Sequence, residues 1–284
     1  MTGRIGVTFG ILFQGGANMD ASYMEFIVQG SSRIVRTEDA GTAADGRKLY
    51  TCFLDTLQLA EPIQAVLHYG DGLSVSQEYS LVKYIEYFDK HTDVFDDVTI
   101  DLIHALADYG HYAQIFLSPY NNWEYGSDYV TMAKYYRTSF DEQAIRNSVN
   151  GYQFIVEPGT SALSEATYSL RLDSETAIIL NLTVKDGTPL SGAVTLNGRT
   201  FYPEQDGEGT YILRIEGVNA SQYGDILTIT GDAGGEFRIQ TSVLGYIRSL
   251  LNSKSYRKNT KAKNMVMAMY HFFMATTSYR SIHA

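Results

Sequence analysis

The two halves of the chain carry the same pattern of residues in the same order. Residues 80–85 can be laid over residues 242–247, and the helical stretch 103–109 over 266–272, with a register that differs by one residue. Shorter matches precede these in each half: residues 5–9 with 177–182, Gln29 and Gly30 with Asn197 and Gly198, Tyr50 with Tyr211, and residues 69–71 with 230–232. Such self-similarity indicates a repeated structural unit, so we expect an internal duplication of about 110 residues.

Residue periodicity divides each copy into strands followed by helices. Period-two alternation, with Gly, Asp and Asn between the runs, predicts strands over residues 23–28, 65–69, 168–172, 193–196, 211–215 and 226–230. Helical spacing relates two sets of mostly apolar residues: Leu102, Leu106, Tyr109, Ala113 and Phe116, and later Met265, Met269, Phe272, Thr276 and Tyr279. The sequence therefore predicts an α+β chain, with two tandem copies of an antiparallel β-sandwich, each followed by an α-helical hairpin.

The duplication also sets the expected domain boundaries. We expect the first sandwich and its hairpin over residues 1–119 and the second over residues 151–284. Residues 119 to about 164 have no counterpart in the duplication, and residues 120–150 contain the only tryptophan, Trp123. This segment is predicted to be an aromatic-rich connector.

Composition excludes several classes of protein. A hydrophobic content of 44% excludes a wholly disordered chain, and a net charge of −10 has the wrong sign for binding nucleic acid or an anionic membrane. The most apolar stretch, residues 265–275, is about half as long as a membrane-spanning helix, so no membrane insertion is expected. Because Cys52 is the only cysteine, no internal disulfide can form. The absence of a signal peptide at the N-terminus is typical of a fragment of a longer polypeptide.

One set of residues has the spacing of a metal site. His104, Asp108 and His111 lie at i, i+4 and i+7 of a predicted helix, so two imidazoles and a carboxylate would share one face. The duplication aligns both histidines with methionines, and this face is about 200° from the apolar stripe. We therefore interpret it as a solvated or module-facing surface and keep the three residues only as a weak metal candidate. No cofactor is expected, and neither a nucleophile elbow nor a P-loop is present.

Two surfaces are candidates for ligand binding. The connector concentrates aromatic residues that could stack on sugar rings, anchor a protein partner, or simply dock the two domains: Tyr120, Trp123, Tyr125 and Tyr129. The turns of the two helical hairpins carry opposite charge. The first turn has five aspartates between residues 89 and 101, whereas the second has the cations Lys254, Arg257, Lys258 and Lys261. Such asymmetry could steer an acidic partner or orient successive modules, or it could be an exposed loop that has drifted.

The second helix of the first hairpin carries the pattern Leu102-Ile-His-Ala105-Leu106-x-x-Tyr109-Gly110-x-x-Ala113-x-x-Phe116. This pattern resembles a repeat module of large secreted and cell-wall-attached proteins of gut Clostridia, and residues 169–176 resemble the strand that opens the sandwich in such modules. The second copy departs from the pattern, with Phe272 and Phe273 in place of Tyr-Gly and Thr276 in place of the alanine. The resemblance implies a bacterial cell-surface location and a scaffolding or adhesive role, without catalytic residues.

The sequence thus predicts a non-enzymatic, extracellular module that acts as an adhesin or spacer. Its expected partners are a host or bacterial surface protein, or a glycan, together with neighbouring modules of the same polypeptide. One alternative is a carbohydrate-binding accessory region of a secreted glycan-degrading protein, in which Trp123 and nearby tyrosines would line a flat platform. A second alternative is an unrecognised hydrolase, which would have a deep pocket with convergent polar residues.

Overall fold

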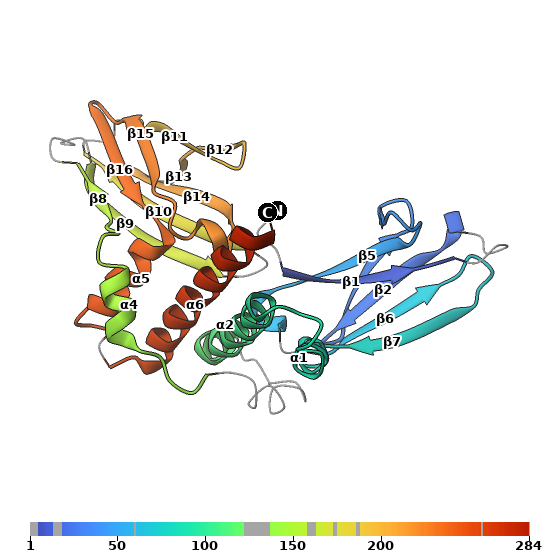
Figure 1. The fold of residues 1–284 in the computed structure, drawn as a ribbon. Helices are drawn as coiled ribbons and strands as arrows, with labels where there is room; N and C mark the ends of the chain where they lie inside the picture. The colour runs from blue at the N-terminus through green and yellow to red at the C-terminus, as the bar shows by residue number, and fades with distance from the viewer. Residues whose placement is uncertain are drawn as a thin grey trace. The chain divides into compact units, whose positions relative to one another are not determined.

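The chain is an α+β protein with four antiparallel sheets, two in each half, and in each half the sheets are followed by helices (Figure 1). The computed structural model describes residues 5–13, 19–59, 61–121, 137–157, 163–172, 175–185, 188–256 and 258–283, and of residues 118–121 only the backbone. Contacts divide the described part of the chain into two compact units, one that ends at residue 121 and one that begins at residue 137. They are called the first half and the second half below.

The first half contains two sheets. Its elements in chain order are β1 (Ile5–Ile11), η1 (Met19–Ala21), β2 (Tyr23–Val28), β3 (Ser31–Arg36), β4 (Gly41–Thr42), β5 (Lys48–Leu54), η2 (Thr56–Gln58), β6 (Ile63–His68), β7 (Ser74–Tyr79), α1 (Leu81–Lys90) and α2 (Asp97–Asn121). One sheet has the order β1-β5-β4 and the other β3-β2-β6-β7. The sheets face each other, because the ring of Phe9 on β1 lies 5.5 Å from that of Phe26 on β2.

The second half also contains two sheets. Its elements are α4 (Glu142–Ser148), β8 (Ile155–Val156), β9 (Leu163–Leu172), β10 (Thr176–Val184), β11 (Ser191–Leu196), β12 (Arg199–Phe201), β13 (Glu204–Gly207), β14 (Thr210–Val218), η3 (Ala220–Gln222), β15 (Leu227–Asp232), β16 (Glu236–Thr241), α5 (Val243–Asn252) and α6 (Thr260–His283). The sheet orders are β13-β14-β10-β9 and β12-β11-β15-β16-β8. With β8 and β9 set aside, the strand order of each sheet is that of the first half.

Two local structures repeat at the positions that the sequence comparison paired. Gln29 and Gly30 join β2 to β3 with φ of 51° and 74°, and Asn197 and Gly198 join β11 to β12 with φ of 53° and 75°. A two-residue hairpin with φ > 0 at both positions matches the twist of the flanking strands, and Asn-Gly is the preferred pair there. The same turn therefore closes the corresponding hairpin in each half.

The first helix of each hairpin begins at a serine. The Ser80 hydroxyl accepts the N–H of Lys83 at 3.3 Å before α1, and the Ser242 hydroxyl accepts the N–H of Gly245 at 2.9 Å before α5. Each side chain satisfies one of the N–H groups that a helix leaves without an intrahelical partner.

None of the helices within the described ranges is long and apolar enough to cross a lipid bilayer.

The predicted strands and helices are present, but one paired segment is wrong in register. Residues 69–71 lie in the turn after β6, whereas residues 230–232 end β15. The reason is that residues 69–73 connect β6 to β7, whereas the shorter segment 233–235 connects β15 to β16. The buried surface of α2 also differs from the predicted apolar stripe and is wider. Ile103, Ala105 and Ala107, outside the stripe, are buried, while Leu102 and Leu106 of the stripe are half-buried.

Candidate functional site

A short helix, α4, positions the side chains of a polar site in the second half. The Asp141 carboxylate caps this helix by accepting the N–H of Ala144 at 2.9 Å. Ile145 in the helix and Val149 directly after it are buried, and they anchor one side of α4. Glu142 and Arg146 are four residues apart, so they project from the same face of the helix and can pair.

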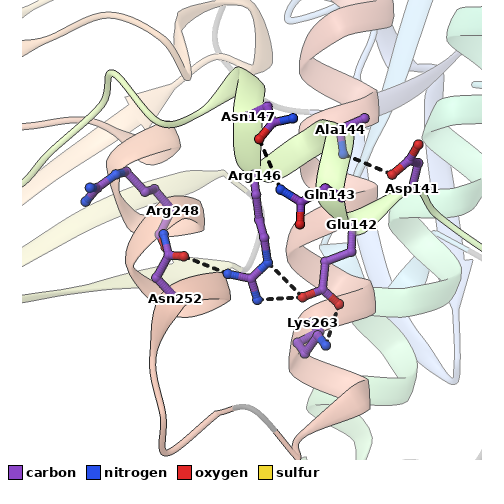
Figure 2. Close-up of polar contacts among 9 residues, drawn as sticks. All are labelled: Asp141, Glu142, Gln143, Ala144, Arg146, Asn147, Arg248, Asn252 and Lys263. Atoms are coloured by element: carbon purple, nitrogen blue, oxygen red, sulfur yellow. Dashed lines mark hydrogen bonds and ion pairs between the residues drawn. The ribbon is translucent and has the colours of Figure 1, made fainter.

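The Glu142 carboxylate is held by two cations (Figure 2). The Arg146 guanidinium donates to Glu142 Oε1, with Nη2 at 2.5 Å and Nε at 2.9 Å, and Lys263 Nζ on α6 lies 2.5 Å from Glu142 Oε2. Arg146 Nη1 also donates to Asn252 Oδ1 on α5 at 2.6 Å, and the Asn252 amide in turn donates to the backbone oxygen of Arg248. One arginine thus connects α4 to α5, and one glutamate connects α4 to α6.

These contacts keep Glu142 ionised. Burial raises the pKa of its carboxyl, but hydrogen bonds and charge from Lys263 and Arg146 outweigh burial and hold the pKa below its usual range. Two cations therefore face one anion, so an excess positive charge remains at the site. A carboxyl with a lowered pKa is a poor general acid at neutral pH, which favours a binding role over proton transfer for Glu142.

The network borders a pocket of about 760 Å³. Its lining combines three cations, four amides, a hydroxyl, one carboxylate and one apolar side chain: Arg146, Lys254, Lys263, Gln143, Asn147, Asn150, Asn252, Ser253, Glu142 and Leu251. Small-molecule sites are usually lined mostly by apolar side chains with a few polar groups. This lining is the reverse, so the pocket suits an acidic or strongly hydrogen-bonding group rather than an apolar ligand.

The structure gathers one of the predicted lysines into this pocket. Lys254 lines it, beside Arg146 and Lys263, whereas Lys258 and Lys261 are exposed and do not line it. Arg257 lies outside the described residues. The predicted basic turn of the second hairpin thus contributes one side chain to the pocket and two to the surface.

The aromatic part of the connector, residues 122–136, lies outside the described part of the chain. This holds for Trp123, Tyr125 and Tyr129, and Tyr120 is described only as backbone near the end of α2. The proposal that these side chains bind a ligand therefore remains a prediction.

The weak metal candidate has a different environment from the one expected. His104 Nε2 lies 2.9 Å from Asp89 Oδ1 on α1. Asp108 and His111 are 0% and 2% exposed, so the expectation of a solvated face is wrong for these two residues. Burial lowers the pKa of His111 to about 4. Within the described ranges, no three His, Cys, Asp or Glu side chains are grouped so that they could hold a metal ion.

The sequence reasoning missed Glu142, Arg146 and the amides of α4. These residues lie in the segment without a counterpart in the duplication, so the comparison of the two copies gave no information about them. A local signal was available, because Asp141 followed by Glu142 and then Arg146 is typical of a capped helix with an i,i+4 ion pair.

Comparison of the chain with protein-family models, with curated proteins and with solved structures finds no match.

Proposed function

We propose that this chain is a non-enzymatic module of a bacterial surface protein, an adhesin or spacer built from two copies of one β-sandwich with a helical hairpin. The observation that carries the proposal is the common strand order of the two halves, with the same turn at Gln29 and Asn197 and the same cap at Ser80 and Ser242. A repeated scaffold extends a polypeptide and multiplies its contact surfaces. The likeness to repeat modules of clostridial surface proteins supports the same role.

The pocket beside α4 is the proposed contact for a partner protein. Arg146, Lys254 and Lys263 line the pocket with a single carboxylate, Glu142, so an acidic side chain of the partner would find unneutralised positive charge and amide donors. Arginine in particular binds carboxylates through parallel hydrogen bonds. The exposed Lys258 and Lys261 would add long-range attraction, which speeds association more than it strengthens the complex.

The test measures binding of the full chain to immobilised poly-L-glutamate, a probe of acidic protein surface. Salt is raised from about 0.01 M to about 1 M, which shortens the Debye length from about 30 Å to about 3 Å. We expect binding at low salt, its loss at high salt, and at least about tenfold weaker binding after Lys254→Glu with Lys258→Glu, because an ion pair at 4 Å contributes about 1 kcal/mol even in water. A matched control reverses Arg36 and Lys185, two exposed cations elsewhere on the chain.

The outcomes separate cleanly. Equal losses of binding in the two variants would mean that net charge, and not the pocket, drives binding, and they would overturn the proposal. Absence of binding at low salt would also overturn it.

A second candidate is carbohydrate binding, favoured by the amides of Asn147, Asn150 and Asn252 in the pocket, which can hydrogen-bond sugar hydroxyls. Salt-independent binding to a neutral plant glucan, abolished by Asn150→Ala, would support that candidate instead.

A further inference from the structure

The central strand pairing of the second half has no complete equivalent in the first. β10 pairs with β14 on one edge and with β9 on the other, where Leu163–Leu172 runs antiparallel along its whole length. β1 occupies the position of β10, because it pairs with β5 as β10 pairs with β14. Among the described residues, the other edge of β1 pairs with no strand. A strand edge of this kind presents unpaired N–H and C=O groups.

The burial of the two strands differs accordingly. Ile178, Leu180 and Leu182 of β10 are 0%, 0% and 1% exposed. In β1, the side chains that alternate toward the core, among them Val7 and Phe9, are only half-buried. β9 therefore completes an apolar core in the second half that remains partly open in the first.

A pocket of about 510 Å³ lies along this open side of the first half. All of β1 lines it, together with Tyr79 at the end of β7, Leu81 and Tyr84 of α1, and Leu106 of α2. β1 and β7 are the edge strands of their sheets, and their counterparts β10 and β16 are extended by β9 and β8. The pocket thus lies where the second half has two additional strands.

The tyrosine against which such a strand would pack is also present in both halves, as Tyr246 and Tyr84. In the second half, the ring of Tyr168 on β9 packs edge-on against Tyr246 at 5.7 Å, and its hydroxyl lies 3.1 Å from that of Ser249, also on α5. Tyr246 lies four residues after the cap Ser242, as Tyr84 lies four residues after Ser80. Tyr84 lines the pocket of the first half and is 38% exposed.

We propose that the open side of the first half binds an extended peptide segment of a partner protein, which adds to β1 as an antiparallel strand. Its chemistry is that of β9: polar residues alternating with an inward row such as Ala166, Tyr168, Leu170 and Leu172, with an aromatic residue to pack on Tyr84. Main-chain hydrogen bonds would supply affinity, and the inward row would supply specificity. The groove shares no residue with the polar pocket beside α4, so either proposal can fail without the other.

The first test adds a fluorescent peptide with the sequence of residues 163–172 to the full chain and measures anisotropy and hydrogen exchange. We expect binding, slower exchange in β1 and unchanged exchange in β10. Tyr84→Ser should weaken binding about tenfold, since burial of an aromatic pair contributes on the order of 1 kcal/mol. The matched control is Tyr87→Ser, an exposed tyrosine of the same helix that does not line the pocket. Protection confined to β10 would show exchange with β9 and would overturn the proposal.

A second test removes the dependence on a weak free peptide. Residues 163–175 are placed directly before Ile5 of the full chain, which copies the connection between β9 and β10 and raises the effective concentration of the added strand. We expect a higher melting temperature and slower alkylation of Cys52 in β5. The control carries Tyr168→Ser and Leu170→Ser in the added copy only. If the added segment and its control behave alike in both measurements, β1 does not accept a strand.

Discussion

The hydroxyl of Tyr223 lies 2.8 Å from that of Thr176, buried in the second half. A similar pair in the first half joins Tyr50 and Thr37 at 2.7 Å, but there Thr37 also donates to the Ser22 carbonyl. We expect Tyr223→Phe to lower the free energy of unfolding by about 1–3 kcal/mol, because a buried hydroxyl loses its partner, and Tyr50→Phe by about 1 kcal/mol. Urea denaturation followed by circular dichroism measures both. A larger loss for Tyr50→Phe would contradict this ranking.

The two serine caps predict matched losses of stability. Ser80→Ala and Ser242→Ala each leave a helix N–H without its side-chain acceptor, so each should cost about 1 kcal/mol. Replacement by glycine should cost only a few tenths of that, because glycine is itself favourable at the N-cap position. Denaturant midpoints of the four variants provide the measurement, and an equal effect of alanine and glycine would argue against capping.

His111 predicts a loss of stability in acid. Its pKa is about 4 in the folded chain, against 6.5 as the ordinary value, because burial disfavours the charged form. The free energy of unfolding is therefore highest above pH 6.5. It falls by about 3 kcal/mol as the pH drops toward 4, because the unfolded chain binds a proton there that the folded chain does not. His111→Gln should flatten the stability curve between these two values. His271, whose pKa is also lowered by burial, is present in both proteins, so the difference between their curves reports His111.

Glu142 and Lys263 predict a measurable coupling. A double-mutant cycle with Glu142→Gln and Lys263→Gln should give a coupling of about 1 kcal/mol, because both side chains are partly buried and Arg146 orders the carboxylate. The exposed pair Glu204 and Arg214, at 2.6 Å, is the control and should give a coupling near zero. Similar couplings for the two pairs would show that burial adds nothing at α4.

Cys52 predicts a protected thiol. It is 2% exposed on β5, and burial raises its pKa to about 11, so almost no thiolate is present at neutral pH. Alkylation by a maleimide should be very slow in the folded chain and complete in denaturant, as followed by intact mass. Rapid labelling without denaturant would mean that the core of the first half opens readily.

Features set by neighbouring residues were predictable from the sequence, whereas features set by distant pairing were not. The turn at Gln29 and Gly30 and the cap at Ser80 depend on a few consecutive residues, and the duplication displayed each of them twice. The pairing of β16 with β8 and the bond from Arg146 to Asn252 join segments that lie far apart in the sequence and share no local pattern. Residues 69–71 were wrongly paired with residues 230–232, because similarity between short stretches of sequence does not reveal that the connecting loops differ in length.

The presence of β9 beside only one of the two equivalent strands bears on how the chain comes apart. A half whose sheet has an additional edge strand and a half whose equivalent sheet lacks one should melt at different temperatures, although the two share one strand order. Gentle heating would then populate a species with an intact second half and an unravelled first half, which a single sigmoidal curve would conceal. Under a stretching force, the same difference would make the first half unfold before the second.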